Sequence, residues 1–146
     1  LCCYEARKRA GVTGKVLGLC HSEKSAERLK KLGFCDVVFT ADAQKPVEVM
    51  NIVSELTNGQ MADITINNVN VPDTEMTSIL CTKNTGTVYF FSMATSFTKA
   101  ALGAEGVGSD VTMIIGNGYT KGHADITLQI LRESEALRNI FTELYA

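Results

Sequence analysis

Residues Met61-Ala-Asp-Ile-Thr-Ile-Asn-Asn-Val-Asn70 begin as a β-strand and end in a run of side-chain amides. Ile64 and Ile66 stand between β-tolerant neighbours after the Asn58-Gly59 turn signal, and Pro72 makes the chain turn again. Strands alternate with helices on both sides of this segment, which is typical of an open parallel α/β sheet. Because ligands bind beyond the carboxyl ends of such strands, we expect this strand end to form one wall of a cofactor site.

The composition is that of one soluble globular domain. The chain has 146 residues, of which 45% are hydrophobic and 21% are charged, and its formal net charge is −2. The sequence has no basic stripe interleaved with aromatic residues, no apolar run near the ~20 residues of a membrane span, and no secretory signal pattern. We therefore expect neither nucleic acid nor a membrane as a partner.

The five cysteines are scattered along apolar elements and show no C-x-x-C spacing. They are Cys2, Cys3, Cys20, Cys35 and Cys81. With only His21 and His123 as further nitrogen ligands, the sequence predicts no metal site. An odd, scattered set is typical of reduced core cysteines, which favours a cytoplasmic location.

Hydrophobic periodicity and turn residues predict a chain of alternating helices and strands. The strands are expected at residues 15–20, 36–40, 61–67, 87–93 and 110–115. The helices are expected at residues 1–10, 23–32, 46–57, 73–80, 98–104 and 122–146, the last with a new cap at Ser134 and with Ile126, Ile130, Leu137, Ile140, Phe141 and Leu144 on its buried side. This pattern predicts a Rossmann-type α/β fold, a parallel sheet with helices on both faces, without its first, central strand.

The chain opens on Leu1, and its first ten residues already have a helical pattern with no strand before them. We therefore expect residues 1–146 to be an N-terminally truncated dinucleotide-binding domain that includes the C-terminal helix. In the strand order 3-2-1-4-5-6 the missing strand is central, so the strands at 15–20 and 61–67 would each have an unpaired edge. Each buried open backbone group costs about 1–3 kcal/mol, so we do not expect this chain to be stable alone.

The usual phosphate-binding signature of this fold, a G-x-G-x-x-G turn between a strand and a helix, is absent. Gly103, Gly106 and Gly108 precede a strand and are expected to form a loop. At the end of the first expected strand, His21 and Ser22 stand where an acidic residue would bind the adenosine ribose and repel a 2′-phosphate. The Ser22 hydroxyl can bind a ribose hydroxyl or a phosphate, and it can equally cap the next helix. The sequence therefore leaves both NAD and NADP open.

The ends of the later strands carry the other candidate cofactor contacts. They are Asn68, Val69 and Asn70, then Ser92 and Met93, then Gly116 and Asn117. Each has an ordinary alternative, because amides serve turns and apolar side chains fill cores. Their coincidence on successive strand ends favours a nicotinamide site. Lys99 and Glu105 are alternative contacts for a substrate carboxylate and ammonium, although both residue types are most often solvated.

Three segments of the chain are similar to the L-erythro-3,5-diaminohexanoate dehydrogenase family. They are Val69-Asn-Val-Pro-Asp-Thr-Glu-Met76, Phe90-Phe-Ser-Met-Ala-Thr-Ser96 with the residues up to Gly108, and Met113-Ile-Ile-Gly-Asn-Gly-Tyr119. The resemblance covers essentially the whole chain and is most specific from Val69 onward.

The resemblance implies a cytoplasmic bacterial enzyme of lysine fermentation. Such an enzyme oxidatively deaminates 3,5-diaminohexanoate to 5-amino-3-oxohexanoate, releases ammonia and reduces NAD, with NADP as a substitute. By the wider kinship with medium-chain alcohol dehydrogenase-like proteins, Asn68, Val69, Asn70, Ser92 and Met93 would face the nicotinamide ribose, and Asp42 would lie near the adenine. The catalytic groups of those enzymes lie largely in a separate N-terminal domain. The catalytic residues therefore stay unknown, and we expect the isolated chain to be inactive.

Two alternative functions remain open on the sequence. Another medium-chain NAD(P)-dependent reductase would act on an alcohol, a carbonyl or a quinone. A non-catalytic module would bind NAD(P) without turnover. By analogy with related dehydrogenases, we also expect a homo-oligomer whose partner is a small diamino acid substrate.

Overall fold

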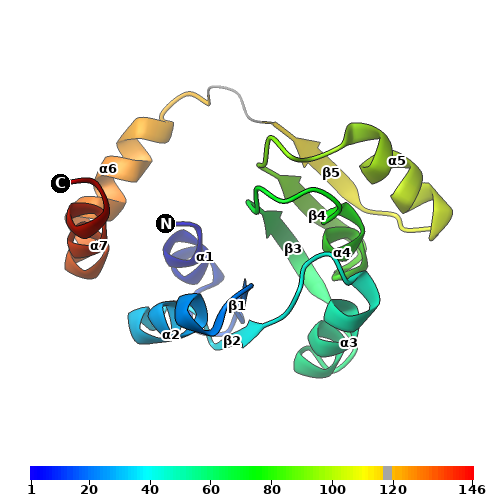
Figure 1. Ribbon diagram of the computed structural model, residues 1–146, viewed down its shortest axis with the longest axis horizontal. Helices are drawn as coiled ribbons and strands as arrows, with labels where there is room; N and C mark the ends of the chain where they lie inside the picture. Colours follow the sequence, from blue (N-terminus) through cyan, green and yellow to red (C-terminus); the bar gives the residue numbers. More distant parts are fainter. Residues whose placement is uncertain (117–119) are drawn as a thin grey trace. The chain divides into compact units, whose positions relative to one another are not determined.

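The computed structural model describes residues 1–116 and 120–146. In chain order the elements are α1 (Cys2–Ala10), β1 (Leu17–Cys20), α2 (Glu23–Leu32), β2 (Val37–Thr40), α3 (Pro46–Leu56), β3 (Ala62–Asn67), α4 (Glu75–Leu80), β4 (Thr82–Phe90), α5 (Phe97–Gly106), β5 (Thr112–Ile115), α6 (His123–Glu133) and α7 (Glu135–Tyr145) (Figure 1). The chain divides into two compact units, which we call the first unit (Leu1–Thr40 with Tyr119–Ala146) and the second unit (Ala41–Gly118).

The first unit contains a parallel pair of short strands. β1 and β2 pair from Leu17 opposite Val37 to Cys20 opposite Thr40. The helix between them runs over the residues expected from the sequence, because Ser22 caps its start and Gly33 ends it in the left-handed conformation, with φ 68°. Its inner face packs on this pair, and Ala26 is fully buried.

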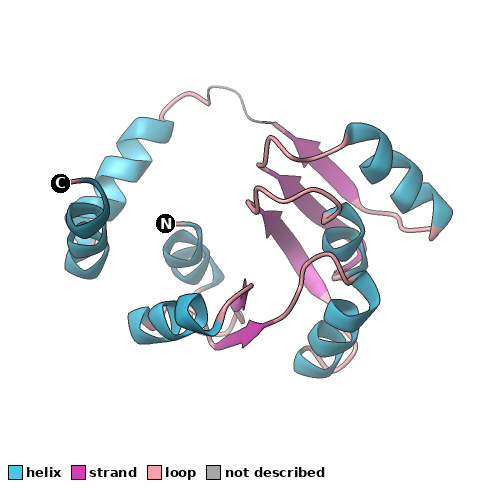
Figure 2. Cartoon of the chain, viewed as in Figure 1, coloured by secondary structure: helices cyan, strands magenta, loops and turns pink. Residues whose placement is uncertain are grey.

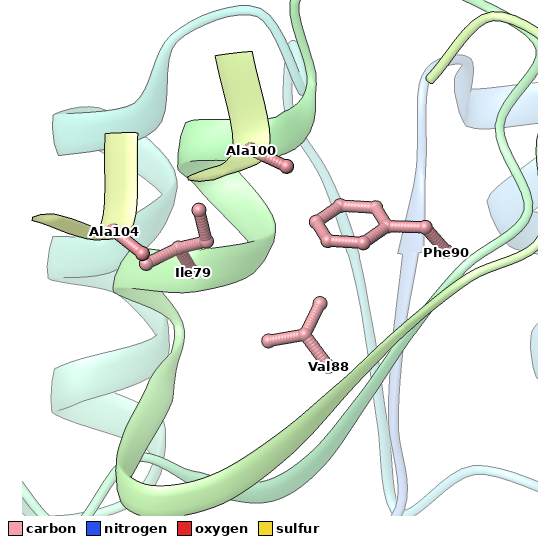
Figure 3. Packing of buried hydrophobic residues seen from close by; sticks show 5 residues of the cluster. All are labelled: Ile79, Val88, Phe90, Ala100 and Ala104. Atoms are coloured by element: carbon pink, nitrogen blue, oxygen red, sulfur yellow. The ribbon is translucent and has the colours of Figure 1, made fainter. Parts of the chain in front are cut away.

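The second unit is a three-stranded parallel sheet in the order β3-β4-β5. Side chains alternate across each strand, so Val88 and Phe90 of β4 share one face, which α4 and α5 cover (Figure 2). These two side chains pack against Ile79, Ala100 and Ala104 to form the core of the unit (Figure 3). The core residues are almost completely buried, and α3 lies beside α4 with Val49 and Val53 buried.

The strand orders of both units confirm the predicted parallel α/β class. If strand 1 is taken out of the order 3-2-1-4-5-6, two groups of neighbouring strands remain. Strands 3 and 2 correspond to residues 36–40 and 15–20, and strands 4, 5 and 6 correspond to residues 61–67, 87–93 and 110–115. The structure has these two groups, and in the described residues β1 and β3 each pair along one edge only. The assignment of the whole chain to one truncated domain stays a prediction.

Two sequence expectations were wrong in detail. β4 begins at Thr82, five residues before the expected start, because Thr82 pairs with Ala62 ahead of a register shift. Gly106 belongs to α5 and not to a loop, because this helix runs two residues past its expected end at residue 104. A Cβ on Gly103 would lie 2.6 Å from the Met76 sulfur, so the helix approaches α4 closely at this residue.

The C-terminal segment is helical as expected, and the Ser134 hydroxyl caps α7 by accepting the Leu137 N–H. Its buried side is narrower than predicted, since only Ile130 and Leu137 of the six expected residues are buried. Ile126 and Leu144 remain 44% and 53% exposed. In the described part of the chain, no helix has the length and apolarity needed to cross a membrane.

Candidate functional site

The carboxyl ends of β3, β4 and β5 meet at one edge of the second unit. Asn67 lies opposite Phe90, and Phe90 lies opposite Ile115. The ladder continues one residue past the strands, where the Phe91 N–H donates to the Asn67 carbonyl at 2.8 Å and the Gly116 N–H donates to the Phe90 carbonyl at 3.3 Å. This edge brings together most of the predicted contacts, namely Asn68, Val69, Asn70, Ser92, Met93 and Gly116, which we call the strand-end site.

The buried side-chain amide of Asn67 holds this edge of the sheet by hydrogen bonds. Asn67 is 6% exposed, and its Nδ2 donates to Thr74 Oγ1 at 2.9 Å and to Ser78 Oγ at 2.8 Å. Its Oδ1 accepts the Val69 N–H at 3.1 Å, which fixes the first turn beyond the strand. The Thr74 hydroxyl donates onward to the Val71 carbonyl at 3.3 Å. The side-chain amide of Asn67 is therefore hydrogen-bonded within the protein through both its nitrogen and its oxygen.

The side chains of the strand-end site lie at the surface. Asn68 and Asn70 are exposed, Val69 and Ser92 are half-buried, and Met93 is 80% exposed. The Ser92 hydroxyl lies 3.4 Å from Asn70 Oδ1 and accepts the Ala94 N–H at 3.1 Å. These amide and hydroxyl groups are neutral donors and acceptors, which fit the hydroxyls of a nucleotide ribose.

Asp42 lies on a segment that is attached to the same loop. Its Oδ1 accepts the Gln44 N–H at 3.0 Å, and Gln44 Nε2 donates to the Pro72 carbonyl at 3.0 Å. The Thr77 hydroxyl donates to the Ala43 carbonyl at 2.6 Å. The structure thus joins the residues after β2 to the turn that follows β3.

His21 and Ser22 belong to the first unit, where both are exposed at the end of β1. The Ser22 hydroxyl accepts the Ser25 N–H at 3.3 Å, so the expected helix cap is present. Its suggested ribose contact stays a prediction. The remaining candidate, Asn117, lies outside the described residues.

The supporting residues Asn67, Thr74 and Ser78 were missed as a group by the sequence interpretation, which treated the amides of this strand end alike. The alternation of the strand gave no signal for them, because Asn67 shares its face with the polar Asp63 and Thr65. The apolar Ile64 and Ile66 lie on the opposite face and are 65% and 46% exposed, so a pattern-based assignment would have placed Asn67 on the outside.

Charged side chains lie on α5 and in the turn before α4, next in the chain to the strand-end site. Lys99 and Asp73 form an exposed ion pair, and the hydrogen bond that the Lys99 ammonium donates to Asp73 raises the pKa of Lys99. Lys99 is therefore engaged with the protein, and Glu105 is exposed on α5. The strand-end site itself offers hydrogen bonds and apolar contact without an acid or a base.

The described residues do not fit a zinc ion. None of their His, Cys, Asp and Glu side chains form a group of three or more that could hold a metal. Burial raises the pKa of the Cys81 thiol to about 12 and that of the Cys35 thiol also to about 12, so neither is an activated thiolate.

Two curated relatives carry the same name, "L-erythro-3,5-diaminohexanoate dehydrogenase". One, from Acetoanaerobium sticklandii, is 64% identical over 145 residues, which are 99% of this chain and 42% of the relative. The other, from Fusobacterium nucleatum subsp. nucleatum, is 54% identical over 145 residues, again 99% of this chain and 42% of the relative. The resemblance inferred from the sequence is confirmed, and the chain spans less than half the length of these relatives.

A solved mycobacterial quinone oxidoreductase shares the fold, with a TM-score of 0.60 and 17% sequence identity over 78% of this chain and 34% of that one. The sequence profile of the family described as "Zinc-binding dehydrogenase" matches residues 1–105, which is most of the chain. This protein therefore belongs to the zinc-binding dehydrogenase family.

Proposed function

We propose that this chain supplies the nicotinamide-side wall of an NAD(P)-dependent dehydrogenase that oxidatively deaminates 3,5-diaminohexanoate. The products are 5-amino-3-oxohexanoate and ammonia, and the setting is lysine fermentation in the bacterial cytoplasm. One observation carries the proposal: neutral amide and hydroxyl groups from two successive strand ends converge at one edge of a parallel sheet. The names of the two curated relatives support the choice of substrate.

In this proposal each part of the strand-end site has one task. Asn68, Asn70 and Ser92 bind the ribose hydroxyls next to the nicotinamide, and Val69 and Met93 provide apolar contact for its ring. Gly116 leaves room for the ring, since among the described residues a Cβ there would meet the Tyr89 hydroxyl alone, at 4.0 Å. On the sequence alone, Asn117 joins this group.

The adenosine side is proposed from the first candidates along the chain. Asp42 lies toward the adenine, and His21 and Ser22 lie toward the adenosine ribose. Ser22 combines this contact with its capping of α2, because a serine oxygen has two lone pairs and one donor. With no carboxylate at the end of β1 to repel a 2′-phosphate, the chain accepts NAD and tolerates NADP.

Held by Asn68, Asn70 and Ser92, a nicotinamide nucleotide would supply the hydride acceptor for oxidation at the substrate carbon that carries the 3-amino group. The chain's own contribution is orientation, because the strand-end site holds the nucleotide by hydrogen bonds to neutral groups. The substrate amine must be neutral at hydride transfer, so a general base is required. We assign no described residue to that role, and the catalytic residues stay unknown.

The full-length natural protein tests the proposal. Incubation with 3,5-diaminohexanoate and NAD should raise the nicotinamide absorbance and release ammonia in equal amounts, with a slower reaction when NADP replaces NAD. Simple alcohols and quinones serve as controls and should give no comparable rate.

Turnover of these controls without turnover of the diamino acid would favour a different reductase. Binding of NAD without turnover of any substrate would favour a non-catalytic module. Light scattering of the same sample tests the proposed homo-oligomer.

A further inference from the structure

A buried carboxylate joins the two loops that carry the strand-end site. Glu75 lies in the first turn of α4 and is 2% exposed. Its Oε1 accepts the backbone N–H of Ser96 at 2.6 Å. Ser96 is in turn the N-cap of α5, where its hydroxyl accepts the Lys99 N–H at 3.3 Å. A carboxylate is costly to bury, so its removal from water calls for a specific partner, and this hydrogen bond is one.

Two further links connect the same loops at the surface. The Ser92 hydroxyl lies 3.4 Å from Asn70 Oδ1, and Lys99 pairs with Asp73. Asp73 has a φ of 66°, which is uncommon for a residue other than glycine, so its backbone is held by its surroundings. The loop after β3 is thus joined to the loop after β4 by the Asn70–Ser92 contact and to α5 by the Asp73–Lys99 pair, besides the contact between Glu75 and Ser96.

The buried contact is the strongest of the three links. Exposed ion pairs are screened by water and contribute little, and a hydroxyl-to-amide bond of 3.4 Å is long. The bond between Glu75 and Ser96 is short, at 2.6 Å, and its acceptor side chain is 2% exposed. Without this hydrogen bond both loops would stay attached to their strands, but the distance between the two loops would no longer be fixed.

We infer that Glu75 is a positioning residue: through Ser96 it sets the distance between the loop that carries Asn68 and Asn70 and the loop that carries Ser92 and Met93. This inference rests on the proposed function, because that distance matters only if both loops contact one nucleotide. Glu75 does not itself reach the nucleotide, since its side chain is buried beneath the two loops.

Two variants of the full-length natural protein separate positioning from packing. Glu75→Ala removes the acceptor, and Glu75→Gln keeps an oxygen that accepts the Ser96 N–H. We expect Glu75→Ala to raise the dissociation constant for NADH, followed by its fluorescence, about tenfold, the equivalent of ~1.4 kcal/mol. We expect Glu75→Gln to remain within about threefold of the wild type. The KM for NAD should follow the dissociation constant, while kcat changes less.

A matched control removes a surface link. Asp73→Asn abolishes the ion pair with Lys99 and should change the NADH dissociation constant by less than about twofold. If Glu75→Ala does not fold, Glu75→Asp takes its place, because the shorter side chain draws the carboxylate away from Ser96 and should also weaken NADH binding.

Three results would overturn the inference. Glu75→Ala that is less stable but binds NADH as tightly as the wild type would show a packing role only. Glu75→Gln that binds as weakly as Glu75→Ala would show that the hydrogen bond is not what matters. Unchanged NADH binding by Glu75→Asp, where Glu75→Ala does not fold, would also contradict it. A wild-type protein with no affinity for NADH would instead remove the proposed function itself.

Discussion

The sequence assigns two groups of residues to one cofactor, one group beyond β3 and β4 and the other beyond β1, and the two are built in different ways. Beyond β3 and β4, the candidate contacts stand on a layer of buried polar side chains, with Asn67 and Glu75 6% and 2% exposed. Beyond β1, the candidates His21 and Ser22 are exposed. The Ser22 hydroxyl accepts the Ser25 N–H as the helix cap and also donates to the Ser25 hydroxyl. The second unit thus fixes the geometry of its site by internal contacts, whereas the first unit offers a helix cap.

This difference suggests a division of tasks in cofactor binding. A reacting ring must be held at a defined distance and angle, and buried hydrogen bonds to the supporting shell provide that precision. The adenosine end of a dinucleotide requires affinity more than precise alignment. The buried network is therefore expected on the nicotinamide side.

The largest expected effect concerns the cores of the two units. Phe90→Ala should lower the free energy of unfolding by about 4 kcal/mol, because a fully buried phenylalanine leaves a large cavity. Phe34→Ala, in the first unit, should lower the free energy of unfolding by about 1.5 kcal/mol. The expected loss is smaller because Phe34 is half-buried and packs edge-on against Tyr4, with 5.2 Å between the ring centroids. Denaturant unfolding of the full-length natural protein measures both. Equal losses of unfolding free energy in the two variants would contradict the expected difference between the cores of the two units.

The next effect tests the buried amide directly. Asn67→Leu should destabilise the protein by about 3 kcal/mol, because it leaves the Val69 N–H without its acceptor and removes the donor for Thr74 and Ser78. Asn51→Leu, at an exposed position of α3, is the control and should change stability by less than about 0.5 kcal/mol. A loss below about 1 kcal/mol for Asn67→Leu would mean that the network does not support the strand end.

A smaller effect is expected from the cap in the first unit. Ser22→Ala removes the acceptor for the Ser25 N–H and should cost about 1 kcal/mol, measured as above. Ser22→Gly should cost only a few tenths of a kcal/mol, because glycine is well tolerated at an N-cap. If both substitutions were neutral, the capping role of Ser22 would be wrong, and a ligand contact would be its remaining role.

The smallest effect is a pH dependence in the first unit. The pKa of Asp36 lies below its usual value, chiefly because the Val16 N–H donates to its carboxylate at 2.6 Å and also because Arg7 lies beside it. The stabilisation from a lowered carboxyl pKa is complete above the unfolded pKa of about 3.9 and is lost as the pH falls through the folded value. Asp36→Asn should therefore reduce the loss of thermal stability between about pH 5 and pH 2, as seen by circular dichroism. Identical pH profiles for both proteins would contradict this assignment.

Local signals predicted the parts of the fold that depend on local chemistry. Ser22, Gly33 and Ser134 mark helix ends by side-chain or backbone geometry that a few residues determine, and the structure has all three. The strand order also followed, because alternating strands and helices leave few parallel arrangements.

Tertiary packing explains what the sequence could not predict. A Cβ at Gly103 would lie 2.6 Å from the sulfur of Met76 in a different helix, and no local pattern encodes that close approach. The exposure of Ile126 likewise depends on which neighbours cover α6. At the candidate site, the exposed amides were found by their place at a strand end, whereas the role of Glu75 depends on a partner 21 residues away.

A crystal structure of the full-length natural protein with bound NAD tests the central claim most directly. We predict the nicotinamide ribose within hydrogen-bonding distance, about 3 Å, of the Asn68–Asn70 loop and of Ser92. A nucleotide bound away from the carboxyl ends of β3 and β4, with those side chains facing only solvent, would contradict the account.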